Sequence, residues 1–130
     1  MLDQLFIKTY KLRYTFNMIS YYTFYNNFKI KSLCNIYKNK PLLIIGNGPS
    51  INKTPLDDFC NVPSIGMNKI NLLFPKVKWR PSIILCSNRL VIKQNREFFT
   101  KTQIPVFLSW KGRRAISYLN RRNLNYYLTN

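Results

Sequence analysis

The stretch PLLIIGNGPS, residues 41–50, is the strongest indication of fold in this chain. Its apolar run, residues 42–45, does not alternate with polar residues, a pattern typical of a strand buried on both faces in a parallel α/β sheet. Gly46 and Gly48 follow, and glycine lets a backbone turn tightly and approach a ligand closely. Because ligands of open α/β sheets bind at the carboxyl ends of strands, this loop is the first candidate for a functional site.

Three further apolar segments, residues 62–67, 81–87 and 104–109, alternate with stretches that predict helices or turns. These stretches are a loop or short helix at 54–59, a helical turn at 69–74, a helix at 90–99 and a basic helix after Gly112. This alternation predicts an α/β fold, a partial Rossmann-like parallel sheet of about four strands with flanking helices and right-handed crossovers. The last strand would then be an exposed edge. We expect this half domain to occupy residues 39–130, after an aromatic, basic helical extension over residues 1–38.

The chain carries 21 Lys and Arg but only 4 Asp and Glu, a net charge of +17. Such an excess favours polyanions, namely nucleic acid, acidic lipid or phosphorylated ligands. The surplus is spread along the chain, and the Lys, Asn, Ile and Tyr bias of an AT-rich genome explains it equally well. Three widely spaced cysteines and the absence of histidine argue against a disulfide framework and predict no metal site.

Residues 1–38 allow two interpretations. The favoured one is a helix that packs its aromatic face on the following domain. The other is a helix on an anionic membrane, with Lys8, Lys11 and Arg13 toward the head groups. A secretion signal is not indicated, and no apolar run reaches the roughly 20 residues needed to cross a bilayer. The sequence therefore predicts a cytoplasmic protein, with peripheral contact to the inner face of the membrane as the second interpretation.

An asparagine follows each of the first three predicted strands: Asn47, Asn68 and Asn88. The carboxyl ends of parallel strands meet at one edge of a sheet, so these side chains would converge on one crevice. An amide both donates and accepts hydrogen bonds, which suits a ribose, a base edge or a phosphate. Each asparagine taken alone equally suits a helix cap or a turn.

The segments GNGPSINKTPLDDF (46–59) and IGMNKINLLFPKVKWRPSIILCSNRLVIKQNREFF (65–99) resemble the amino-terminal half of bacterial sialyltransferase-like glycosyltransferases. They are most similar to the related 6-hydroxymethylpterin pyrophosphokinase-like domain of surface-polysaccharide and flagellin-modification proteins. The resemblance covers roughly residues 38–110. It implies a metal-independent, inverting transfer from a nucleotide-sugar donor such as CMP-sialic acid to a glycan or lipid-linked acceptor. The residues that match the family's donor site are Gly46, Asn47, Gly48, Pro49, Ser50, Asn68 and Asn88.

The chain departs from that family because it has no histidine to act as the base. We interpret Asp57 and Asp58 as structural residues in the first turn of a helix, and Glu97 as a partner of Lys93. The chain is therefore interpreted as the donor-binding half of a transferase, a truncated fragment that is inactive alone.

The basic ending, KGRRAISYLNRRNLNYY at 111–127, suggests an alternative. Arginines at 113, 114, 121 and 122 would grip a phosphate backbone while Tyr118 and Tyr126 stack on bases, as in a small nucleic-acid-binding protein. The favoured interpretation is a surface helix with Ile116 and Leu119 inward. An inactive remnant is the third hypothesis.

Overall fold

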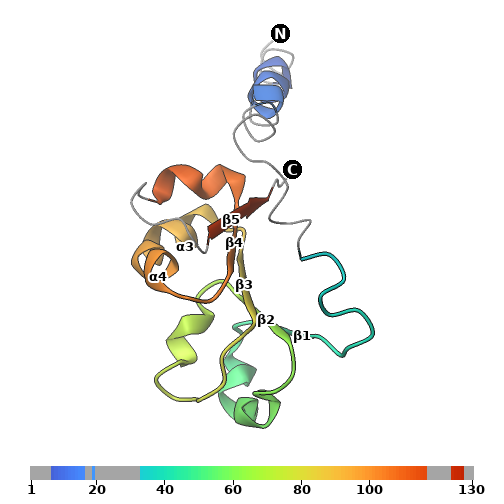
Figure 1. Cartoon of the computed structure of the whole chain (residues 1–130). Helices are drawn as coiled ribbons and strands as arrows, with labels where there is room; N and C mark the ends of the chain where they lie inside the picture. Colours follow the sequence, from blue (N-terminus) through green and yellow to red (C-terminus); the bar gives the residue numbers. More distant parts are fainter. Residues whose placement is uncertain (1–6, 17–18, 20–32, 117–123, 128–130) are drawn as a thin grey trace.

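The computed structural model describes residues 7–16, 19, 33–116 and 124–127 (Figure 1). Five strands form one sheet in which every neighbouring pair is parallel. This arrangement confirms the predicted α/β, Rossmann-like class of fold. The strands are β1 (Leu43–Ile45), β2 (Ser64–Met67), β3 (Ile83–Cys86), β4 (Val106–Ser109) and β5 (Leu124–Tyr127).

Short helices connect the strands, and most of them are 3₁₀ turns. The helix expected over residues 90–99 is divided at Asn95 into two α-helices of six residues each. A further helix, residues 7–16, precedes the sheet. The connecting helices are η1 (Pro49–Lys53), η2 (Leu56–Phe59), η3 (Ile70–Leu73), α3 (Arg89–Gln94), α4 (Arg96–Lys101) and η4 (Trp110–Ala115).

The strands lie in the sheet in the order in which they occur in the chain, β1-β2-β3-β4-β5. Right-handed crossovers that always advance in one direction place every connection on the same face of the sheet. Figure 1 shows the connecting helices gathered on one side of the strands. In the described part of the chain, no helix covers the opposite face of β1–β3.

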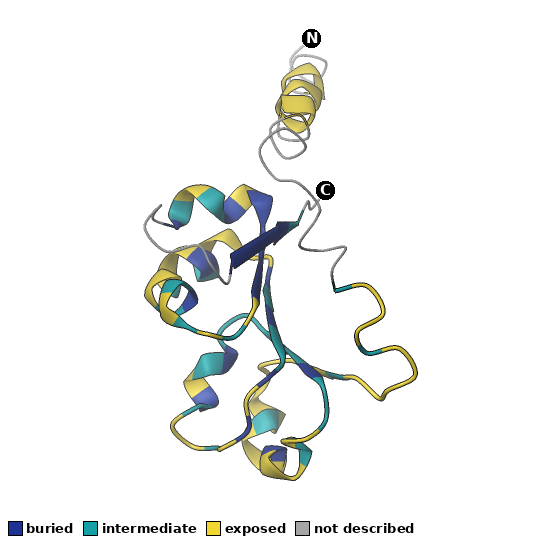
Figure 2. Ribbon diagram, viewed as in Figure 1, coloured by how far each residue is buried: buried dark blue, intermediate teal, exposed yellow. Residues whose placement is uncertain are grey.

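The hydrophobic core fills the space between the covered face and these helices (Figure 2). Alternate residues of β3 and β4 point into it, and Ile84, Val106 and Leu108 are fully buried. Trp79, from the loop before β3, and Ile92, from α3, close the other side of this layer. Burial of each such side chain contributes about 1.5–3 kcal/mol, so this layer supplies a large share of the apolar stabilisation.

The prediction that residues 42–45 are buried on both faces is wrong. Ile44 of β1 is 71% exposed, and its two neighbours in the strand are only partly buried. The physical reason is the sheet order, because β1 lies at an edge and only one face of the sheet receives crossovers. Ile65 and Ile83, which follow Ile44 across the same face, are also only partly buried.

The carboxyl-terminal part differs from the prediction too. The sheet has five strands rather than about four, because Leu124–Tyr127 forms β5 and pairs with β4. The predicted exposed edge at residues 104–109 is therefore wrong, and all four residues of β4 are buried. The basic helix expected after Gly112 is limited to the 3₁₀ helix η4. The expectations for Tyr118, Leu119, Arg121 and Arg122 lie outside the described residues.

The helix at residues 7–16 stands away from the sheet in Figure 1, and each of its side chains is exposed. The favoured interpretation, a helix that packs its aromatic face on the domain, is therefore wrong for these residues. No helix in the described ranges is long and apolar enough to cross a membrane.

Candidate functional site

The predicted donor loop, Gly46, Asn47, Gly48, Pro49 and Ser50, lies exposed at the carboxyl end of β1. Gly48 is the N-cap residue of η1 and Pro49 begins that helix, where a missing N–H is harmless. Neither Gly46 nor Gly48 has a positive φ, and a Cβ atom added at either would meet no atom within 4 Å. The backbone turn therefore does not require glycine, and the two glycines leave open backbone that a ligand can approach.

Asn68 follows β2 directly, and Asn88 lies two residues after the end of β3. Asn68 has the left-handed φ of 54°, which asparagine tolerates better than most residues, and its N–H donates to the Leu85 carbonyl at 2.8 Å. The Oδ1 of Asn88 accepts hydrogen bonds from the N–H groups of Leu90 at 2.9 Å and Val91 at 3.3 Å. Asn88 is thus the N-cap of α3.

The three predicted asparagine positions follow neighbouring parallel strands, so they share one edge of the sheet. Adjacent strands are about 4.8 Å apart, which places the ends of β1 and β3 about 10 Å from each other. The described strands never reverse their order, so they form no topological switch point, the usual place for a ligand crevice. None of the seven predicted site residues lines the large pocket of this structure.

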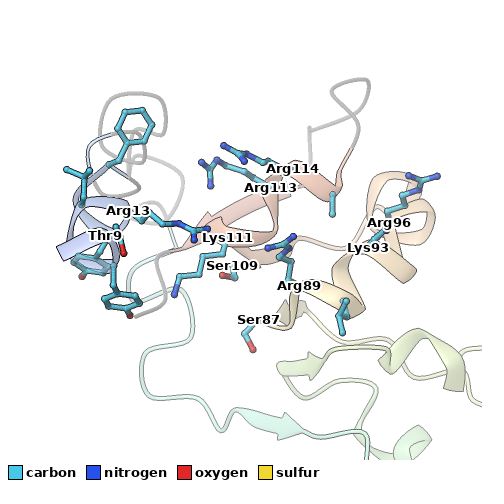
Figure 3. A pocket seen from close by; sticks show the side chains of 16 residues that line it. Thr9, Arg13, Ser87, Arg89, Lys93, Arg96, Ser109, Lys111, Arg113 and Arg114 are labelled. Atoms are coloured by element: carbon cyan, nitrogen blue, oxygen red, sulfur yellow. The ribbon is translucent and has the colours of Figure 1, made fainter. Parts of the chain in front are cut away.

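That pocket, of about 1040 Å³, lies at the carboxyl ends of β3 and β4 (Figure 3). Ser87 and Ser109 lie on the sheet side of it, and Thr9 belongs to the helix at residues 7–16 that forms the opposite wall. Seven basic side chains line it: Arg13, Arg89, Lys93, Arg96, Lys111, Arg113 and Arg114.

No Asp or Glu is among the described residues that line the pocket. Two acids of the chain make contacts outside the pocket, as the structural interpretation of Asp57 and Glu97 expects. Asp57 accepts a hydrogen bond from the Trp79 N–H at 2.8 Å. Glu97 pairs with Lys101 at 2.6 Å, and this hydrogen bond and charge lower the pKa of Glu97. The predicted partner Lys93 is wrong, because α3 ends before α4 begins and the two residues do not share one helix.

One of the cations is held firmly in place. Arg113 donates from Nη1 to the Trp110 carbonyl at 2.9 Å, and its guanidinium lies 4.4 Å from the centre of the Trp110 ring. Trp110 in turn meets Tyr126 edge to face, with ring centroids 5.7 Å apart. Tyr126 is only 1% exposed. The hypothesis that Tyr126 stacks on nucleic-acid bases is therefore wrong.

Hydroxyl groups lie beside the cations. Tyr127, the register partner of Ser109, forms a side-chain hydrogen bond with Ser87. Burial raises the pKa of Tyr127, and the Ser87 hydrogen bond offsets part of that rise. Burial likewise raises the pKa of the Cys86 thiol to about 11. A weak hydrogen bond from the thiol to the Asn88 carbonyl offsets part of this rise. Because its described lining holds seven cations and no carboxylate, the pocket suits binding of an anion.

The sequence contains one signal for this pocket that the prediction did not use. Arg89 and Lys93 are four residues apart, which places both basic side chains on one side of α3, and Arg96 follows at the start of α4. Their association with Lys111 and Arg13 depends on tertiary structure. Within the described ranges, no group of three His, Cys, Asp or Glu side chains is placed to hold a metal ion.

No protein-family model, curated protein or solved structure matches this chain. The geometry and charge of the sheet edge are therefore the features that indicate a function.

Proposed function

We propose that this chain is a nucleotide-sugar-binding domain of the glycosyltransferase type, a part of a transferase that lacks the catalytic base. The observation that carries the proposal is the pocket at the ends of β3 and β4, with seven basic side chains and no acid among its described residues. Arginine forms paired, charge-assisted hydrogen bonds with phosphate, so this pocket suits a phosphate ester. The pocket lies at the carboxyl edge of a parallel sheet, and α/β folds bind nucleotides at this edge.

The donor would lie along this edge. Its base and ribose would contact the open loop at Gly46–Ser50 and the end of β2 at Asn68, and its phosphate would face Arg89 and Lys111. The span of about 10 Å between the ends of β1 and β3 is within the reach of one nucleotide. A CMP-sugar is the first candidate because of the resemblance in sequence, with a glycan or lipid-linked acceptor, in the cytoplasm. We expect no transferase activity from this chain alone.

Titration calorimetry with CMP, cytidine and inorganic phosphate tests the proposal. We expect CMP to bind and cytidine to bind far more weakly, because cytidine lacks the phosphate. Arg89→Gln removes a charge-assisted hydrogen bond and should weaken CMP binding about tenfold or more. Lys76→Gln removes the same charge from an exposed site outside the pocket and should leave the affinity unchanged.

A second pair of variants examines the donor loop. Asn47→Ala and Asn68→Ala should weaken CMP but leave the affinity for inorganic phosphate unchanged. The proposal fails if CMP does not bind, or if Lys76→Gln and Arg89→Gln weaken it equally. Binding of an arbitrary oligonucleotide with a steep salt dependence, without binding of CMP, would instead identify a nucleic-acid-binding protein.

A further inference from the structure

The charge of the pocket exceeds what one nucleotide can neutralise. A phosphate group carries about two negative charges at neutral pH. Seven basic side chains line the pocket, and Figure 3 shows Arg96 and Arg114 toward its edge, whereas Arg13 extends from the opposite wall toward Lys111. Exposed cations at the rim, such as Arg96 and Arg114, therefore remain available to a second anionic surface.

The same rim carries large apolar side chains that face solvent. Leu12 and Phe16 are 72% and 71% exposed and lie one turn apart on the helix at residues 7–16. Leu90, on α3 at the other wall, is 68% exposed. All three line the pocket, so apolar groups flank the cations on both sides. Single exposed leucines are ordinary on a protein surface, but here three large apolar side chains line one cation-rich pocket.

We infer that this rim docks on a membrane surface that contains anionic lipid. The lipid phosphates would bind Lys93 and Arg96, while the three apolar side chains enter the boundary between head groups and acyl chains. Lys8 and Lys11, on the same exposed helix as Leu12, extend the basic surface. This role goes beyond donor binding and does not depend on it.

The apolar side chains favour a lipid surface over a nucleic acid. Tyr10 and Tyr14 also line the pocket, and tyrosine suits both a membrane interface and base stacking. Leu12 and Leu90 gain little from a sugar–phosphate chain, but they leave water when they enter a bilayer. Leu12 and Leu90 therefore favour a lipid surface over a nucleic acid as the partner.

Sedimentation of the full chain with lipid vesicles tests this inference. We expect binding to vesicles of phosphatidylcholine with phosphatidylglycerol, and little binding to phosphatidylcholine alone. The double variant Leu12→Gln/Phe16→Gln keeps the net charge and should weaken the binding at least tenfold. Leu72→Gln is the matched control, because Leu72 is 66% exposed on η3 and lies outside the pocket.

A charge pair completes the test. Lys93→Gln/Arg96→Gln should weaken vesicle binding about tenfold or more, whereas Lys76→Gln/Lys78→Gln, with the same change in charge outside the pocket, should have much less effect. The fluorescence of buried Trp79 and Trp110 verifies that each variant is folded.

Equal binding to both kinds of vesicle would overturn the inference. So would a loss in Leu12→Gln/Phe16→Gln no larger than in Leu72→Gln, because the site would then be purely electrostatic, as for a nucleic acid. Full displacement from vesicles by millimolar glycerol phosphate would also overturn it, since it would indicate a site for a free phosphate ester. Failure of CMP to bind leaves these outcomes unaffected.

Discussion

Replacing Asn88 by alanine separates its structural role from a role in ligand binding. Its Oδ1 accepts from two N–H groups at the start of α3, at 2.9 and 3.3 Å. Loss of such a cap destabilises a protein by about 1 kcal/mol. For a chain of this size, that change corresponds to a decrease in Tm of about 3–5 °C. Asn88→Ser keeps a capping oxygen and should retain most of the stability.

Urea unfolding, followed by the fluorescence of buried Trp79 and Trp110, measures both variants. We expect the midpoint of Asn88→Ala to shift with an unchanged m-value, because the same surface is exposed on unfolding. The reasoning is refuted if Asn88→Ala loses less than about 0.3 kcal/mol, or if Asn88→Ser loses as much as Asn88→Ala. In that case the side-chain oxygen of Asn88 does not stabilise the start of α3.

Three further predictions concern the sheet. Ile84→Ala should lower the free energy of unfolding by about 2–5 kcal/mol, whereas Ile44→Ala, at a 71% exposed position, should change it by less than about 0.5 kcal/mol, as measured by urea unfolding. Gly66→Ala places a Cβ 2.8 Å from the Cγ2 of fully buried Ile70, so thermal unfolding should show a decrease in the free energy of unfolding of about 1–3 kcal/mol. An unchanged free energy of unfolding would mean that the Ile70 side chain moves aside without cost. Burial raises the pKa of Cys86 to about 11, above that of the unfolded thiol, so the unfolded state loses its proton first as the pH rises. The free energy of unfolding should therefore fall by about 1 kcal/mol between pH 8 and 10, and urea unfolding of Cys86→Ala should not show this decrease.

The positions of four strands could be predicted from the sequence because the patterns that indicate them are local. Each of the four predicted segments contains an observed strand, such as β3 within residues 81–87. Short apolar runs that end in glycine or asparagine are a property of neighbouring residues, so a single sequence reveals them. The capping role of Asn88 belongs to the same class, since it depends on residues two and three positions away.

The fifth strand and the pocket could not be predicted from local sequence patterns. Tyr126 belongs to a basic, polar stretch, and only its parallel pairing with Leu108 of β4 makes it part of the core. The cations of the pocket come from three places far apart in the chain, the helix at residues 7–16, the α3–α4 region and η4. No spacing pattern along the sequence indicates that these side chains lie close together.

The sequence by itself thus determined the class of fold, the positions of four strands and the large positive charge. Only the tertiary structure decided the order of the strands, the face that remains uncovered and the place where the charge gathers. The physical reason is that parallel pairing joins segments about twenty residues apart, such as Ile65 with Ile83 and Ile84 with Val106. Strand order is set by the packing of those long-range pairs, and the burial of Ile84 and the exposure of Ile44 follow from it.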